Sequence, residues 1–171
     1  MYPQKDRNLE ESDALIRALA WNDAFGCYTR AGFEKLIWPE IADRARWIIY
    51  FDIDGMHAIN ETHQGYDAAD AMIKETLAVL RLTDYVAGQW KSGDEFLICV
   101  IDGGPRSAVG DQRLRLGDPR KMMERLIDEL AKHGMTATFA VVPVVSAELV
   151  ENVQPAVDQV YAAKGQRGDR R

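Results

Sequence analysis

One apolar run that ends in two acids constrains the fold of this chain more than any other feature of its sequence. Residues 47–51 read Trp-Ile-Ile-Tyr-Phe, and Asp52, Ile53 and Asp54 follow them directly. An uninterrupted apolar run of this kind predicts a buried strand. Acidic side chains are rarely buried without a partner, so we expect Asp52 at the rim of a sheet. There it is either a functional carboxylate or a solvated acid that caps the next helix.

A second acidic site follows about forty residues later, in the stretch Lys-Ser-Gly-Asp-Glu-Phe that contains Asp94 and Glu95. It separates two further apolar runs, residues 85–90 and 96–101, and its Ser-Gly pair is typical of a hairpin tip. Carboxylates at a strand end and at a neighbouring hairpin tip can converge on one point. Two such carboxylates suit divalent metal ions that hold a nucleoside triphosphate.

The remaining sequence predicts an α/β (α+β) domain with a mixed sheet flanked by helices. A lead-in helix is expected over residues 8–20 and a turn over residues 22–30. Asp118 and Pro119 are typical of the start of a helix, and Pro39 predicts a kink. We expect helices over residues 30–45, 56–62, 67–81, 119–132 and 153–163, and strands over residues 46–53, 85–90, 96–101 and 136–145.

Length and charge limit the classes of function. The chain has 171 residues, which suits a connector over residues 1–21 and one domain over residues 22–171. Its net charge of −6 argues against nucleic-acid and anionic-membrane partners, and no apolar stretch approaches the ~20 residues of a membrane span. Cys27 and Cys99 lie among apolar neighbours, so we expect reduced core thiols in a cytoplasmic protein.

Four motifs in order resemble the GGDEF domain, the diguanylate cyclase family: FDIDGMHAIN, GYDAAD, SGDEF and YAAK. The resemblance runs from about Asn22 to Gly168. It implies a palm-like mixed sheet of about five strands. It also implies that two protomers, each holding one GTP, form a homodimer that makes cyclic di-GMP and releases two pyrophosphates.

The resemblance assigns metal-binding and catalytic roles to the acidic residues. Asp52, the backbone carbonyl of Ile53 and Asp94 would hold two Mg²⁺ ions in each half-site. Asp94 or Glu95 would help to deprotonate the attacking hydroxyl group. Asp54 also matches an acid of the family, with a less direct role.

The same resemblance assigns the substrate contacts. Asn60 and Asp70 would read the guanine base, because a carboxylate accepts the N1 and exocyclic amino hydrogens that adenine lacks. Ser92 replaces the first glycine of the signature, which affects the close approach of the nucleotide. The residues expected to bind substrate are Asn60, Asp70, Ser92, Gly93, His57, Lys164 and Arg167.

The phosphate-binding residues depart from the family pattern. Lys164 matches the family lysine, but Gly168 stands where its partner arginine is usual, and Arg167 or Arg170 is close enough to replace it. His57 stands where a lysine is usual and is largely neutral at pH 7. We therefore expect weaker triphosphate binding than in a typical member.

Arg81 and Asp84 form the RxxD pattern of the family's product-inhibition site. The hairpin that follows is about two residues longer than usual, so the pattern is out of register. An arginine at the end of a helix is also explained by the helix dipole.

Two other functions stay open. The chain could be a degenerate GGDEF module that binds GTP weakly or not at all and regulates a partner or an attached phosphodiesterase or sensor domain. A relative that makes another cyclic nucleotide is disfavoured, because Asp70 selects guanine.

Overall fold

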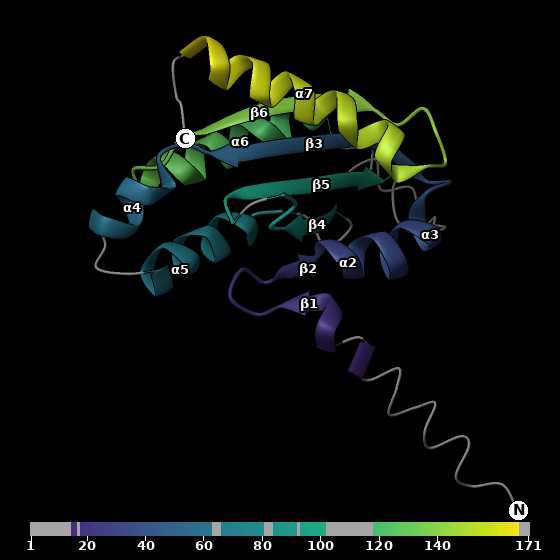
Figure 1. The fold of residues 1–171 in the computed structure, drawn as a ribbon, viewed down its shortest axis with the longest axis horizontal. Helices are drawn as coiled ribbons and strands as arrows, with labels where there is room; N and C mark the ends of the chain where they lie inside the picture. The colour runs from purple at the N-terminus through teal and green to yellow at the C-terminus, as the bar shows by residue number, and fades with distance from the viewer. Residues whose placement is uncertain are drawn as a thin grey trace, which may run out of the picture.

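A six-stranded mixed sheet forms the centre of the molecule in the computed structural model (Figure 1). The structure describes residues 15–16, 18–62, 66–80, 84–91, 93–101 and 118–167, without the side chains of Thr62, Asp84 and Arg167. The strand order is β1-β2-β4-β5-β3-β6, and only β2 and β4 run parallel. The strands are β1 (Trp21–Asn22), β2 (Cys27–Thr29), β3 (Ala45–Ile53), β4 (Asp84–Gly88), β5 (Glu95–Ile101) and β6 (Ala137–Pro143).

The apolar run of residues 47–51 lies in β3, which pairs with β5 on one side and β6 on the other. Every residue of β3 from Ile48 to Ile53 is buried. This burial confirms the predicted buried strand and explains its uninterrupted apolar sequence, because a strand covered on both faces has no solvent side. The expected hairpin is also present as antiparallel β4 and β5.

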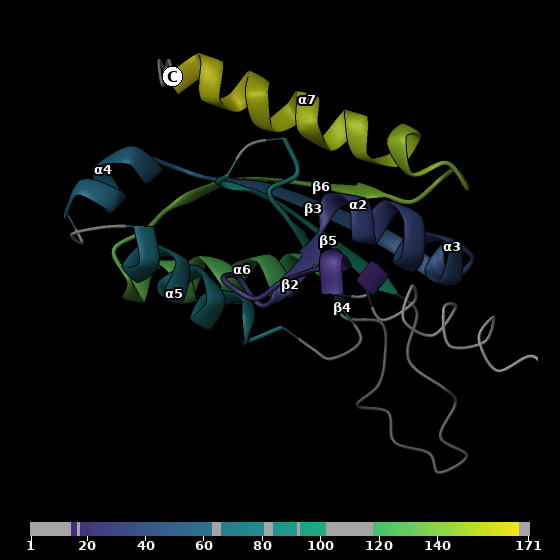
Figure 2. The same ribbon diagram turned by 60° about the horizontal axis from the view of Figure 1, so that its bottom comes forward.

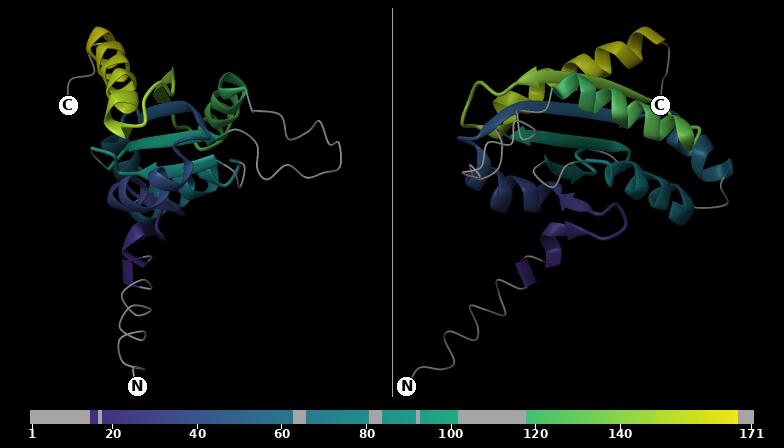
Figure 3. Two further views of the ribbon diagram at one scale, coloured as in Figure 1. Left: turned by 90° about the vertical axis from the view of Figure 1, so that its right-hand side faces the viewer. Right: turned by 180° about the vertical axis from the view of Figure 1, so that it is seen from behind.

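Helices cover both faces of the sheet and create two separate cores. On one face lie α7 (Leu149–Arg167) and a helical segment made of α2 (Arg30–Gly32), η1 (Phe33–Ile37) and α3 (Trp38–Ile41). On the other lie α5 (Tyr66–Leu77) and α6 (Pro119–Lys132). Figure 2 shows α7 on the opposite side of the strands from α5 and α6, and Figure 3 shows the same layers from the side and from behind.

The predicted fold class is confirmed, with six strands instead of about five. The additional strands β1 and β2 lie at one side of the sheet, within or directly before the segment predicted as a turn, and they are only two and three residues long. The helix predicted over residues 30–45 ends at Ile41 and contains a π-helical turn just before Trp38 and Pro39. Proline has no N–H to donate to the preceding turn, which accounts for the irregular turn at this point.

The other predicted elements lie close to their expected bounds. Helix α4 (Met56–Thr62) and helix α6 match the prediction, and α7 begins four residues earlier than expected. The described part of the lead-in segment, residues 15–16 and 18–20, is helical. Residues 102–117, between β5 and α6, lie outside the described residues.

Candidate functional site

The acids at the end of β3 and the start of β5 converge as the sequence predicts. Asp52 and Glu95 are register partners across these two strands, and both side chains are buried. Asp94 comes directly before β5, and its carbonyl oxygen accepts a hydrogen bond of 3.0 Å from the backbone N–H of Ile53. One strand end and one hairpin tip therefore bring Asp52, Ile53 and Asp94 together.

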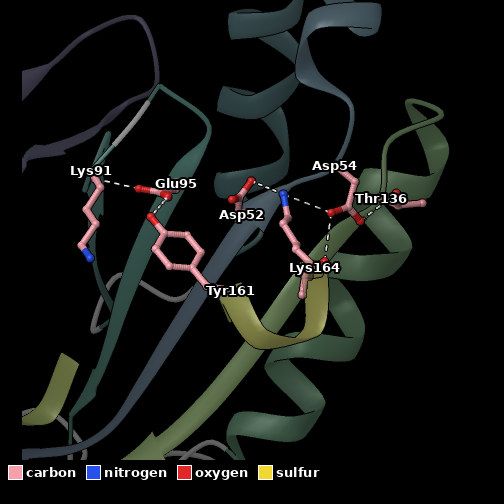
Figure 4. Close-up of polar contacts among 8 residues, drawn as sticks. Asp52, Asp54, Lys91, Glu95, Thr136, Tyr161 and Lys164 are labelled. Carbon is pink, nitrogen blue, oxygen red and sulfur yellow. Dashed lines mark hydrogen bonds and ion pairs between the residues drawn. The ribbon is translucent and has the colours of Figure 1, made fainter. Parts of the chain in front are cut away.

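Helix α7 places an ammonium group among these acids. Lys164 Nζ lies 2.5 Å from Asp52 Oδ1 and 3.3 Å from Asp54 Oδ1. Asp54 is held in turn by the hydroxyl groups of Thr136 and Thr138, at 3.2 and 2.9 Å. Figure 4 shows Lys164 reaching between the two carboxylates. The expected phosphate-binding lysine is thus bound to the acids of the expected metal site.

Glu95 is anchored by a residue whose role the sequence analysis did not assign. The Tyr161 hydroxyl donates to Glu95 Oε1 at 2.6 Å, and the backbone N–H of Lys91 donates to Glu95 Oε2 at 2.9 Å (Figure 4). Tyr161 precedes Lys164 by three residues, so both project from the same face of α7. That spacing in the YAAK motif is the signal that could have identified Tyr161.

The electrostatics of the cluster favour a bound cation. The pKa of the Asp52 carboxyl is raised to about 6, chiefly by burial; the neighbouring Asp94 and Glu95 contribute to the rise, whereas Lys164 opposes it. The single positive charge of Lys164 therefore does not neutralise all of the carboxylates around it. Among the described residues, no three potential ligand side chains form a complete metal site. A metal ion bound here would take additional ligands from the backbone or from the substrate.

A pocket of about 410 Å³ adjoins the acidic residues. Asp94 lies in its wall, together with Asn60 from α4 and Asp70 from α5. The side-chain oxygen of Asn60 is buried without a hydrogen-bond partner, and burial raises the pKa of Asp70, with the nearby Asp67 adding to the shift. A buried acceptor without a donor calls for a ligand that supplies one. The pocket is lined by Phe25, Met56, His57, Asn60, Tyr66, Asp70, Gln89, Gly93 and Asp94.

The other expected substrate contacts are placed only in part. Gly93 and His57 line the pocket, but the His57 side chain is 87% exposed and lies 3.3 Å from Glu61 on the same helix. Ser92 and Arg81 lie outside the described residues, as do the side chains of Asp84 and Arg167. The pocket residues to which no role was assigned from the sequence are Phe25, Met56, Tyr66 and Gln89. Met56 and Tyr66 lie within the motifs FDIDGMHAIN and GYDAAD, whereas Phe25 and Gln89 lie in none of the four motifs.

Solved structures identify the fold. A sensory box/GGDEF family protein from Caulobacter crescentus CB15 is 22% identical, with a TM-score of 0.62 over 86% of this chain and 99% of that chain. The diguanylate cyclase SiaD of Pseudomonas aeruginosa, solved with its activator SiaC, is 20% identical with a TM-score of 0.63. That match covers 95% of this chain and 65% of SiaD.

A third match is the S helix-GGDEF-EAL segment of Vibrio cholerae LapD bound to c-di-GMP, which is 13% identical with a TM-score of 0.63. It covers 96% of this chain and 38% of that chain. No family model matches the sequence, and no curated protein matches it. The chain therefore has the fold of GGDEF domains. None of its described helices combines the length and the apolar character that a membrane crossing requires.

Proposed function

We propose that this chain binds GTP with divalent cations, and that two protomers together condense two GTP molecules into cyclic di-GMP. The observation that carries the proposal is the pocket in which Asn60 and Asp70 lie beside Asp94. A base-reading pair and a metal-binding carboxylate in one cavity match the two ends of a nucleoside triphosphate. Because GTP is an abundant cytoplasmic metabolite, we place the activity in the cytoplasm.

Guanine is the base that fits the polar groups of the pocket. It offers an N1 hydrogen and an exocyclic amino group on adjacent atoms, whereas adenine offers neither in that arrangement. The Asp70 carboxylate and the unpaired Asn60 oxygen are both acceptors. Tyr66 and Met56 in the pocket wall supply apolar area for the flat faces of the base.

Mg²⁺ would be held by Asp52, by the carbonyl of Ile53 and by Asp94. Bound there, it would neutralise charge on the triphosphate and stabilise the charge that develops during transfer. The position of the Lys164 ammonium group between Asp52 and Asp54 supports this assignment, since these carboxylates accommodate positive charge.

The reaction joins the 3′-oxygen of each GTP to the α-phosphorus of the other. The bond from that phosphorus to the bridging oxygen breaks, so pyrophosphate leaves, and the hydroxyl proton passes to a base. Asp94 suits this role because it lines the pocket. Glu95 is fully buried under Tyr161, so we assign it to holding the signature turn. One protomer holds half of the reacting atoms, which makes a homodimer part of the mechanism.

A second candidate is a GGDEF module that binds GTP without turnover and regulates an attached domain. Two of the expected phosphate-binding side chains are engaged with acids of this chain: Lys164 with Asp52 and Asp54, and His57 with Glu61. A triphosphate must compete with these pairs. Tight binding without product would favour this candidate.

Calorimetric titration of GTP and ATP in the presence of Mg²⁺ tests the proposal. Wild type should prefer GTP by about 2–3 kcal/mol, the cost of leaving buried hydrogen-bonding groups unpaired. Asp70→Ser should remove most of that preference, whereas Asp67→Ser, an exposed acid outside the pocket wall, should keep it. Equal affinity of the wild type for ATP and GTP contradicts the assignment.

A further inference from the structure

Gln89 has a backbone conformation that side chains disfavour. Among the described residues it is the only one other than glycine with a positive φ, at 52°. A side chain in this left-handed region strains the backbone, whereas glycine adopts it freely. Such strain persists where the surrounding structure enforces it, and it is concentrated at functional sites. Gln89 follows β4 directly and opens the turn that leads to Asp94.

The strained residue lies in the wall of the nucleotide pocket. Gln89 shares this cavity with Asn60 and Asp70, the two expected base readers. Both of these present acceptors to a guanine base, so they engage its donor atoms. Guanine also carries a carbonyl oxygen, O6, next to those donors, and recognition of that atom requires a donor from the protein.

The hydrogen bonds of Asn22 orient the Gln89 amide. Asn22 Oδ1 accepts from the backbone N–H of Ala24 at 3.0 Å, which assigns the other end of this side chain as its NH₂ group. That NH₂ donates to Gln89 Oε1 at 3.3 Å. The oxygen of Gln89 is therefore used by the protein, and no hydrogen bond of the described residues uses its NH₂ group.

We propose that Gln89 is a specificity-determining residue of this pocket, whose side-chain NH₂ donates to O6 of guanine. The inference rests on the proposed GTP site and adds the group that recognises the acceptor of the base. Adenine carries an amino group at the equivalent position, and two donors facing each other repel. Gln89, Asn60 and Asp70 together then match the donor and acceptor pattern of guanine. The hydrogen bond from Asn22 holds the amide at the pocket.

Two substitutions separate the side chain from the backbone strain. Gln89→Ala removes the amide and keeps a Cβ in the strained conformation, whereas Gln89→Gly removes both the amide and the strain. Each should lower the affinity for GTP on the order of tenfold. Only Gln89→Gly should raise Tm, by roughly 2–4 °C. Gln154→Ala, at an exposed amide on α7, is the control and should leave GTP affinity unchanged.

A ligand altered only at O6 makes the test specific. The triphosphate of 6-thioguanosine keeps the N1 hydrogen and the exocyclic amino group of guanine and replaces O6 by sulfur, a weaker hydrogen-bond acceptor. Calorimetry in Mg²⁺ should show that wild type prefers GTP over this analogue by up to about tenfold and that Gln89→Ala loses most of this preference. If wild type binds GTP and Gln89→Ala binds it equally well, the inference is wrong and the GTP site stands. If wild type binds no GTP, the proposed function and the inference both fail.

Discussion

At the scale of single residues, the folded protein disfavours the charged form of the Asp52 carboxyl. Asp52 is 1% exposed, and its pKa of about 6 reflects chiefly its burial. Lys164 offsets part of this cost, but Asp94 and Glu95 add to it. A site built to bind metal ions is expected to carry this excess negative charge when the metal is removed.

Replacing Asp52 should therefore raise the stability of the fold and lower the affinity for GTP. Asp52→Asn should raise the free energy of unfolding of the metal-free protein at pH 7.5 by roughly 2–3 kcal/mol, since a pKa shift of about two units corresponds to that energy. The same change should abolish Mg²⁺-dependent GTP binding. Urea denaturation and calorimetry measure the two effects. Unchanged GTP affinity in Asp52→Asn contradicts the metal assignment.

The advantage of Asp52→Asn should depend on pH with a defined sign. The native pKa of about 6 lies above the ordinary value of 3.8, so the folded protein keeps the proton to higher pH than the unfolded chain. The stability that this proton contributes is complete below about pH 4 and is lost as pH rises through about 6. The difference between the variant and the wild type should therefore shrink as the pH falls from 7 to 4.

The Tyr161 hydroxyl should contribute measurably to stability. Tyr161→Phe keeps the ring beneath Lys91 and removes one donor to the fully buried Glu95 carboxylate. We expect a loss of about 1–3 kcal/mol in urea denaturation. Tyr66→Phe, at a residue that is 70% exposed, should change stability by less than about 0.5 kcal/mol. Equal stability of Tyr161→Phe and wild type would show that Glu95 does not need this donor.

At the scale of elements, helix α7 carries Tyr161 and Lys164, which contact the buried acids Glu95 and Asp52. The start of this helix must therefore be fixed. Asn152 in its first turn is 1% exposed and binds the preceding loop. Its Oδ1 accepts from the N–H groups of Val145 and Ser146 at 2.8 and 3.0 Å. Its Nδ2 donates to the carbonyls of Ser146 and Glu148 at 2.7 and 3.0 Å. One side chain thus satisfies four backbone groups and holds the connection between β6 and α7.

Removing this anchor should be costly, because the backbone groups around it lose their partners. Asn152→Ala should lower the free energy of unfolding by about 2–4 kcal/mol. The exposed Gln154, two residues along the same helix, provides a matched control, and Gln154→Ala should stay within about 0.5 kcal/mol of the wild type. Thermal or urea denaturation compares the two, and similar stability of both variants would exclude the anchoring role.

The elements were predictable where a long pattern specifies them. The apolar run of β3, the two apolar runs of the hairpin and the Asp118-Pro119 start of α6 each gave nearly correct bounds. The strands β1 and β2 were not predictable, since two or three residues carry no periodicity. They join the sheet through tertiary pairing, β2 with β4 and β1 with β2. The π-helical turn at residues 33–37 likewise depends on the following proline and on packing against the sheet.

The site residues were likewise predictable only where the sequence pattern specifies them. A buried strand that ends in acids and a neighbouring hairpin tip with acids can converge, so the approach of Asp52 and Asp94 where β3 pairs with β5 was expected from the sequence. The pairing of Lys164 with Asp52 did not follow from the sequence, because it depends on where α7 lies across β3. The strain at Gln89 is a property of the backbone, and its amide gives no sequence signal.

At the scale of the whole molecule, each protomer carries one copy of the proposed nucleotide pocket and of the adjoining acidic residues. Under the proposed mechanism the two reacting GTP molecules come from two protomers, so activity should depend on association. Cyclic di-GMP formation per protomer should rise with protein concentration below the dissociation constant of the dimer and level off above it. Rate measurements over a dilution series, with ultracentrifugation of the same samples, test this. A rate per protomer that does not change on dilution to monomer contradicts the mechanism.

The most direct test of the account is to incubate the protein with GTP and Mg²⁺ and to separate the nucleotides by chromatography. We predict cyclic di-GMP and pyrophosphate from the wild type, and neither product from Asp94→Asn, which lacks the pocket-wall carboxylate that we propose as a metal ligand. The contradicting result is a wild-type protein that binds GTP, is dimeric at the concentration used and yields no cyclic di-GMP.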